Sequence, residues 1–68
     1  MSKKSLKVLR NGKHSELGML WFIYQEERHY LVDITLPDRM IQLVTGSLEG
    51  ALDIVKSYHQ ERQLEIKK

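Results

Sequence analysis

Hydrophobic and polar residues alternate with a period of two through the middle of the chain, and this pattern predicts β-strands. Residues 18–25 are rich in aromatic and branched side chains and are apolar on both alternating faces. Residues 29–36 place one set of apolar side chains on a single face: Tyr30, Val32, Ile34 and Leu36. The charged residues 25–28 predict a hairpin between these strands. Pro37 predicts a turn into a third strand over residues 40–44.

The period changes to that of an α-helix after Gly46. Apolar and aromatic residues then recur at helical spacing: Leu48, Ala51, Leu52, Val55, Tyr58 and His59. Ser47 precedes them and suits the N-cap position. Gly50 in the first turn leaves room for the helix to lie close to the sheet. The pattern predicts that the helix ends near Arg62 and that residues 64–66 suit an edge strand.

The N-terminal residues are more polar. Residues 6–9 predict a short first strand, and residues 10–17, which include Asn11-Gly12, predict a loop. The fold class is therefore α+β, with an antiparallel meander of three to five strands packed by one C-terminal amphipathic helix. A length of 68 residues allows one domain. We assign residues 1–13 to a basic arm with a first strand and residues 14–68 to the domain.

The strand over residues 18–25 is apolar on both faces, which one helix cannot cover. Trp21 and Tyr24 point to opposite faces of this strand. Either the sheet curls into a partial, SH3-like barrel, or its open face binds a partner, including a second copy of the chain. Trp21 and Tyr24 are therefore candidate partner-binding residues.

The net charge of +2 is distributed unevenly. The first 13 residues contain no acid and five cations: Lys3, Lys4, Lys7, Arg10 and Lys13. Residues 14–68 contain six cations and nine acids, a net charge of −3. A mobile cationic arm gains affinity for phosphate by releasing counterions. These five residues are therefore candidate nucleic-acid-binding residues.

Signals for catalysis are weak. His14, His29 and His59 fall in a predicted loop, strand and helix, without the spacing of a metal site. The glycines are isolated and form no phosphate-binding loop. Glu26 and Glu27 are adjacent at a hairpin tip, where neighbouring side chains point apart. We therefore expect no catalytic residue, no metal and no cofactor.

The absence of cysteine fits a reducing compartment. No segment reaches the roughly 18 apolar residues of a membrane span. The sequence therefore predicts a cytoplasmic location without membrane association.

Three stretches resemble parts of known families. Residues 6–32, with Gly12-Lys13-His14 before Gly18-Met19-Leu20, resemble the strand–loop–strand of KOW-type SH3-like modules, which bind RNA or proteins. Residues 36–52 resemble the end of HicB-type antitoxin domains, which bind a small toxin. Three strands followed by a helix is also the order in the arm-binding domain of phage-type integrases. Each resemblance covers part of the element pattern, and together they assign the chain to no family.

These observations favour a small non-enzymatic binding module. The leading hypothesis is an accessory or regulatory protein of a nucleic-acid-containing assembly, in transcription, translation or phage and plasmid control, whose basic arm contacts phosphate. The alternative is a protein-binding regulator, similar to an antitoxin or inhibitor, that acts through an exposed apolar sheet face and is able to form a homodimer.

Overall fold

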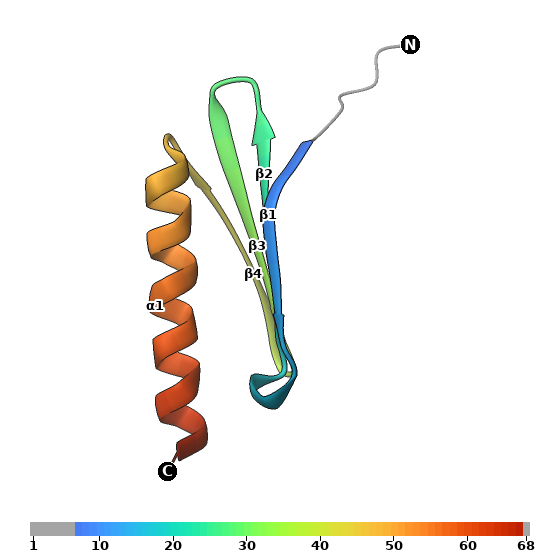
Figure 1. Ribbon diagram of the computed structural model, residues 1–68, viewed down its shortest axis with the longest axis vertical. Helices are drawn as coiled ribbons and strands as arrows, with labels where there is room; N and C mark the ends of the chain where they lie inside the picture. The colour runs from blue at the N-terminus through green and yellow to red at the C-terminus, as the bar shows by residue number, and fades with distance from the viewer. Residues whose placement is uncertain (1–6, 68) are drawn as a thin grey trace.

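A computed structural model describes residues 7–67 and shows a four-stranded sheet with one long helix on one face (Figure 1). The elements in chain order are β1 (Lys7–His14), a 3-10 turn η1 (Ser15–Leu17), β2 (Met19–Glu26), β3 (His29–Leu36), β4 (Arg39–Thr45) and α1 (Leu48–Lys67). The strands lie in the sheet in sequence order, and every neighbouring pair is antiparallel. The predicted α+β meander with a C-terminal helix is confirmed.

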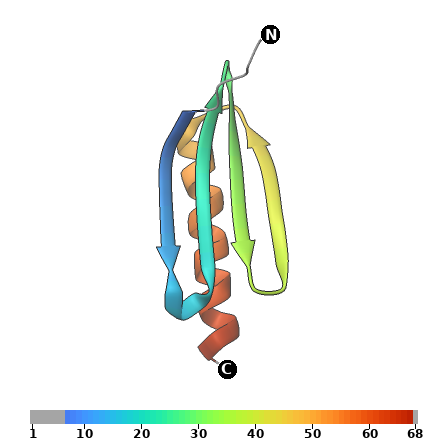
Figure 2. The same cartoon turned by 90° about the vertical axis from the view of Figure 1, so that its right-hand side faces the viewer.

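The sheet is open, so the alternative of a curled barrel is wrong. β1 and β4 are its two edges and do not pair with each other. Two-residue loops, Glu27-Arg28 and Pro37-Asp38, connect β2 to β3 and β3 to β4 at the predicted places. Because these loops are short, consecutive strands are neighbours in the sheet, and Figure 2 shows the four strands side by side in chain order, in front of α1.

The prediction of a loop over residues 10–17 is wrong, because β1 continues to His14. Asn11-Gly12 is not a turn: Gly12 lies opposite Trp21 in the β1–β2 ladder. A Cβ atom on Gly12 would lie 2.5 Å from Trp21 Nε1, so the glycine leaves space for the indole ring. The chain turns later, in η1, and Gly18 ends that turn in the left-handed region with a φ of 65°.

The start of α1 agrees with the sequence prediction, and its end does not. The Gly50 amide donates a hydrogen bond to Ser47 Oγ at 3.0 Å, which confirms Ser47 as the N-cap. A Cβ atom on Gly50 would lie 2.8 Å from Thr45 Oγ1, so this glycine permits the close approach of α1 to the end of β4. The helix continues to Lys67. The predicted end near Arg62 and the edge strand over residues 64–66 are therefore wrong.

The core lies between α1 and one face of the sheet. Its buried side chains are Leu17, Met19, Ile23, Val32, Ile34, Leu36, Ala51 and Val55. The predicted inward face of β3 is confirmed, with Tyr30 half-buried at its end. α1 packs against β2, β3, β4 and η1. Among residues 7–67 the core is thus one layer of side chains between the sheet and the helix, and the other face of the sheet takes no part in it.

Candidate binding surface on the open face of the sheet

The face of the sheet that points away from α1 is uncovered in the described part of the chain. Figure 2 looks onto this open face, with α1 behind the strands. Because cross-strand partners share a face, the register identifies the residues of the open face. The strand alternation puts Met19, Trp21 and Ile23 of β2 on the helix side, and Leu20, Phe22 and Tyr24 on the open side.

One row of the open face is apolar across all four strands. Val8 pairs with Tyr24, Tyr24 with Leu31, and Leu31 with Val44. We call these four residues the apolar stripe. Val8 is 45% exposed and Val44 is 62% exposed, although both are large and hydrophobic. Water therefore contacts a hydrophobic band that crosses the full width of the sheet.

Further hydrophobic side chains extend the apolar stripe toward the η1 end of the sheet. The Phe22 and Tyr24 rings stack with their centroids 6.0 Å apart. Leu20 and Met40 lie in the same row as Lys13 and Thr35, and Met40 is 64% exposed. The stacked pair places two large aromatic side chains next to each other at the centre of the face.

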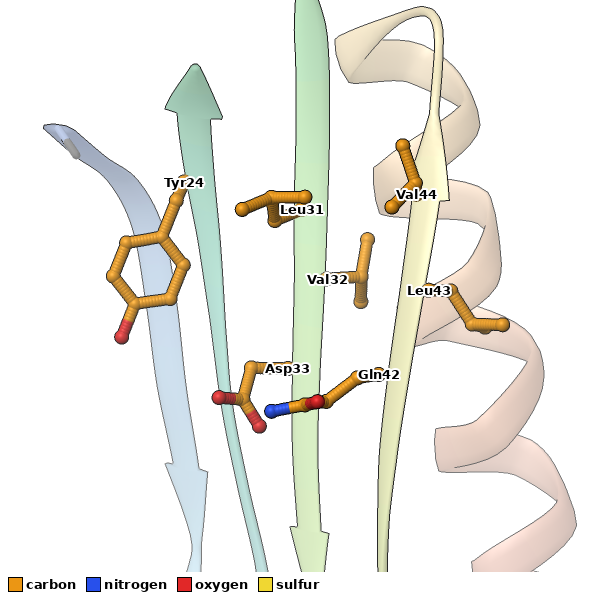
Figure 3. A pocket seen from close by; sticks show the side chains of 7 residues that line it. All are labelled: Tyr24, Leu31, Val32, Asp33, Gln42, Leu43 and Val44. Atoms are coloured by element: carbon orange, nitrogen blue, oxygen red, sulfur yellow. The ribbon is translucent and has the colours of Figure 1, made fainter. Parts of the chain in front are cut away.

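A shallow depression of about 530 Å³ lies over β2, β3 and β4 on this face (Figure 3). Three members of the apolar stripe, Tyr24, Leu31 and Val44, line it together with Asp33 and Gln42. Figure 3 shows the Asp33 carboxylate and the Gln42 amide turned toward each other at one end of the depression. The depression thus joins an apolar floor to one acid and one amide, which suits a partner that is apolar and carries a cation or a hydrogen-bond donor.

The two candidate partner-binding residues lie on opposite faces. Tyr24 belongs to the open face and to the apolar stripe. Trp21 lies on the helix side, half-buried against the core. Its Nε1 donates a hydrogen bond to His14 Nε2 at 3.3 Å, and its ring lies against Gly12. The structure therefore places Trp21 against the core on the helix side and Tyr24 on the open face, and both side chains are half-buried.

Sequence reasoning missed Phe22, Val8 and Val44 as members of this surface. The alternation of β2 already placed Phe22 on the same side as Tyr24. Val8 and Val44, however, join the surface only through the strand register, which places them at the ends of the row of Tyr24 and Leu31. A β-bulge between Val8 and Arg10 shifts this register by one residue. The bulge leaves no clear signal in the sequence.

Two of the three histidines, His14 and His59, pack against each other. The rings of His14 and His59 meet edge to face with centroids 4.5 Å apart. His14 Nε2 also accepts the hydrogen bond from Trp21 Nε1, so His14 contacts both β2 and α1. His29 starts β3 at the opposite end of the sheet. Within residues 7–67 no cluster of three or more histidine and acidic side chains could hold a metal ion.

The candidate nucleic-acid-binding residues are divided by the structure. Lys3 and Lys4 lie outside the described residues. Lys7, Arg10 and Lys13 are exposed along the edge strand β1. Their partners in the ladder are Gln25, Ile23 and Leu20, so Lys13 lies on the open face and Arg10 on the helix side. The three cations therefore border one edge of the sheet, with Lys7 and Arg10 on the helix side and Lys13 on the open face.

Comparison with protein-family models, with curated proteins and with solved structures finds no match to this chain. In the part that the structure describes, α1 is too polar to cross a membrane. The open face and the β1 edge are therefore the two surfaces of the described residues from which a function can be inferred.

Proposed function

We propose that this protein is a small cytoplasmic protein-binding regulator without an active site of its own, and that it binds its partner through the open face of the sheet. The observation that carries the proposal is the apolar stripe, which is continuous over four strands and exposed at both ends. Monomeric proteins rarely expose contiguous apolar patches larger than a few hundred Å², and larger patches mark binding sites. A regulator similar to an antitoxin or inhibitor needs such a surface and no catalytic group.

The composition of the open face supports a protein as the partner. Its centre combines aromatic and aliphatic side chains with one acid, Asp33 on β3, and the other polar side chains lie toward the edges and end of the face: Lys13, Asn11, Gln42 and His29. Protein interfaces have this arrangement, with an apolar centre that supplies binding energy and a polar rim. The stacked Phe22–Tyr24 pair is the kind of aromatic anchor that dominates such interfaces.

Site-specific photo-crosslinking tests this function in cells. A benzophenone amino acid replaces Val44 on the open face or, as a matched control, Leu64 on α1. Val44 is 62% and Leu64 68% exposed, so the two probes meet solvent equally in the free protein. We expect protein adducts from position 44 and few from position 64. Equal adducts from both positions, or none from position 44, would contradict the proposal.

The β1 edge supports a second candidate function, the contact of a nucleic-acid-containing assembly through phosphate. Lys7, Arg10 and Lys13 are exposed along one edge, and Lys3 and Lys4 precede them in the chain. Acids do not occur among residues 1–13, so an approaching phosphate backbone meets only positive charge there. Affinity that arises in this way is insensitive to sequence and falls steeply with salt.

Substitution, not deletion, tests the second function, because removal of residues 1–13 would take β1 out of the sheet. A variant with glutamine at these five positions is compared with a control carrying glutamine at Arg28, Lys56 and Lys67. We expect the first variant to bind labelled single- and double-stranded oligonucleotides more weakly and with a smaller salt slope, and the control to match the wild type. An unchanged slope in the first variant would refute a role for the basic segment.

A further inference from the structure

We infer that the partner of the open face is a second copy of this chain, packed sheet against sheet about a two-fold axis. This inference rests on the proposed function and adds the identity of the partner. It commits to an isologous contact, in which the same surface is used by both copies.

The apolar stripe is its own complement. An axis parallel to the strands, between β2 and β3, lays β1 of one copy over β4 of the other and β2 over β3. Val8 then faces Val44 of the second copy, and Tyr24 faces its Leu31. Every member of the apolar stripe meets another member, so two copies remove the whole hydrophobic band from water.

The position of the apolar stripe selects this axis over one that runs across the strands. An axis along the stripe would also place it on itself. The stripe, however, lies nearer the Glu27-Arg28 end of the sheet than the η1 end. An axis along the stripe would therefore leave the row of Leu20 and Met40 beyond the edge of the second copy. The axis parallel to the strands covers both rows.

The open face is large enough for a specific dimer. Four strands about 4.8 Å apart and seven residues of about 3.3 Å each give a flat area of about 440 Å² per copy. The relief of the side chains raises the accessible area above this flat value, so a face-to-face pair buries more than about 900 Å². A specific interface needs about 1,000 Å² or more in total. Even the flat area of two full faces is thus close to this requirement, and half of the face would fall far below it.

The charges of the open face are also complementary in this arrangement. Lys13 and Asp33 have opposite charges and lie on the same face, two strands apart. In the described part of the chain neither forms an ion pair with another side chain. With the sheets about 10 Å apart, Lys13 of one copy and Asp33 of the other lie about 13 Å apart at Cα, a gap that the long lysine side chain spans to within a few ångströms.

This contact gives Asp33 a countercharge that no side chain of residues 7–67 supplies within one copy. A carboxylate covered by an apolar partner without a cation would be costly. The two-fold axis repeats the contact, so each dimer contains two Lys13–Asp33 pairs. Charge reversal at either position therefore places two repulsive contacts in the interface.

An exchange of charges provides the test. Lys13→Glu and Asp33→Lys are each studied alone and as an equimolar mixture, by sedimentation equilibrium and by native mass spectrometry. We expect each variant alone to self-associate at least about tenfold more weakly than the wild type. In the mixture, both contacts are opposite in charge again, and a heterodimer of wild-type affinity should form. Single variants that dimerise normally, or a mixture that stays monomeric, would overturn the inference.

A second pair of variants covers the case in which the charge variants fold poorly. Val44→Glu places an acid in the apolar stripe, and Leu64→Glu places one on an equally exposed site of α1. We expect Val44→Glu to abolish dimerisation and Leu64→Glu to leave it unchanged. Dimerisation that is equally insensitive to both substitutions would show that copies meet elsewhere.

The failure of this inference is distinguishable from the failure of the proposed function. A wild-type chain that stays monomeric at protein concentrations up to about 1 mM has a dimer dissociation constant above that value, which excludes the second copy as partner. If position 44 still gives photo-adducts with a different protein, the open face remains a protein-binding surface. An adduct of twice the chain mass supports both.

Discussion

Arg62 on α1 donates a hydrogen bond from Nε to the carbonyl oxygen of Leu17 at 2.9 Å, 45 residues away in sequence. Leu17 belongs to η1, so this bond ties the last turns of the helix to the loop end of the β1–β2 hairpin. Glu65 reinforces the contact, with Oε1 3.1 Å from Arg62 Nη1 and Oε2 3.7 Å from Arg39 Nη2. These contacts hold α1 against the sheet beyond the point where its apolar pattern ends.

Replacement of Arg62 by alanine should lower the free energy of unfolding by about 1–2 kcal/mol, because a hydrogen bond from a charged donor to a half-buried carbonyl is lost. Glu65→Gln should cost less than about 1 kcal/mol, since its ion pairs are largely exposed. Urea denaturation followed by the fluorescence of Trp21 measures both. Gln63→Ala, on the exposed side of the helix, serves as control. A loss for Arg62→Ala no larger than that for Gln63→Ala would show that the bond does not contribute.

Gly12→Ala should destabilise the protein by about 1–3 kcal/mol, because the added methyl group overlaps the Trp21 indole ring and forces it to move. Gly46→Ala is the matched control: no heavy atom lies within 4 Å of the position of its Cβ. We expect this second change to be neutral or slightly stabilising, by up to about 1 kcal/mol. Near-UV circular dichroism should show a displaced Trp21 only in Gly12→Ala. Equal effects of the two substitutions would contradict the proposed role of Gly12.

These contacts show how far sequence reasoning reaches for this chain. Alternation over residues 29–36 and the N-cap Ser47 are local signals, and the structure confirms both. Gly12 gives an ambiguous signal, since a glycine serves a turn and a close side-chain approach equally well. The polar residues 10–17 and the Asn11-Gly12 pair favoured a turn, whereas the structure shows that Gly12 makes room for the Trp21 ring.

The end of α1 and the full extent of the open face depend on long-range contacts. Arg62 has no local sequence feature that points to Leu17. Likewise, Val8 and Val44 join Tyr24 and Leu31 in one row only through the pairing of four strands. Strand pairing is set by the whole sheet and by its bulge, which period-two patterns do not specify. For this reason Tyr24 could be found from the sequence and the apolar stripe could not.

Glu27 has a φ of 57°, in the left-handed region that glycine prefers, and is the first residue of the β2–β3 loop. Glu27→Gly should raise the free energy of unfolding by up to about 1 kcal/mol, because relief of the strained backbone exceeds the entropy that glycine adds to the unfolded chain. Arg28→Gly should lower it by about 0.5–1 kcal/mol, since Arg28 does not share this conformation. Thermal denaturation of both variants checks the difference in sign. A stabilisation of the same size from Arg28→Gly would rule out backbone strain as the cause.

Trp21 and Tyr24 lie on opposite faces of one strand, and their substitution should separate folding from binding. Trp21→Ala removes a ring that packs against the core and bonds to His14, so we expect a loss of about 2–4 kcal/mol in the free energy of unfolding. Tyr24→Ala removes a ring that lies on the open face, so its loss of stability in the monomer should be smaller, about 1 kcal/mol. Urea denaturation followed by far-UV circular dichroism compares the two without relying on Trp21 fluorescence.

Self-association should show the opposite order. Tyr24→Ala should weaken dimerisation by at least about tenfold, because an aromatic side chain at the centre of an interface carries a large share of its binding energy. Trp21→Phe, a milder change that keeps a ring against the core, should leave dimerisation unchanged while the fold remains intact. Sedimentation equilibrium at protein concentrations where circular dichroism shows both variants folded makes the comparison. If Trp21→Phe weakens association as much as Tyr24→Ala, the interface includes the helix side of the sheet and the two-fold contact through the open face is wrong.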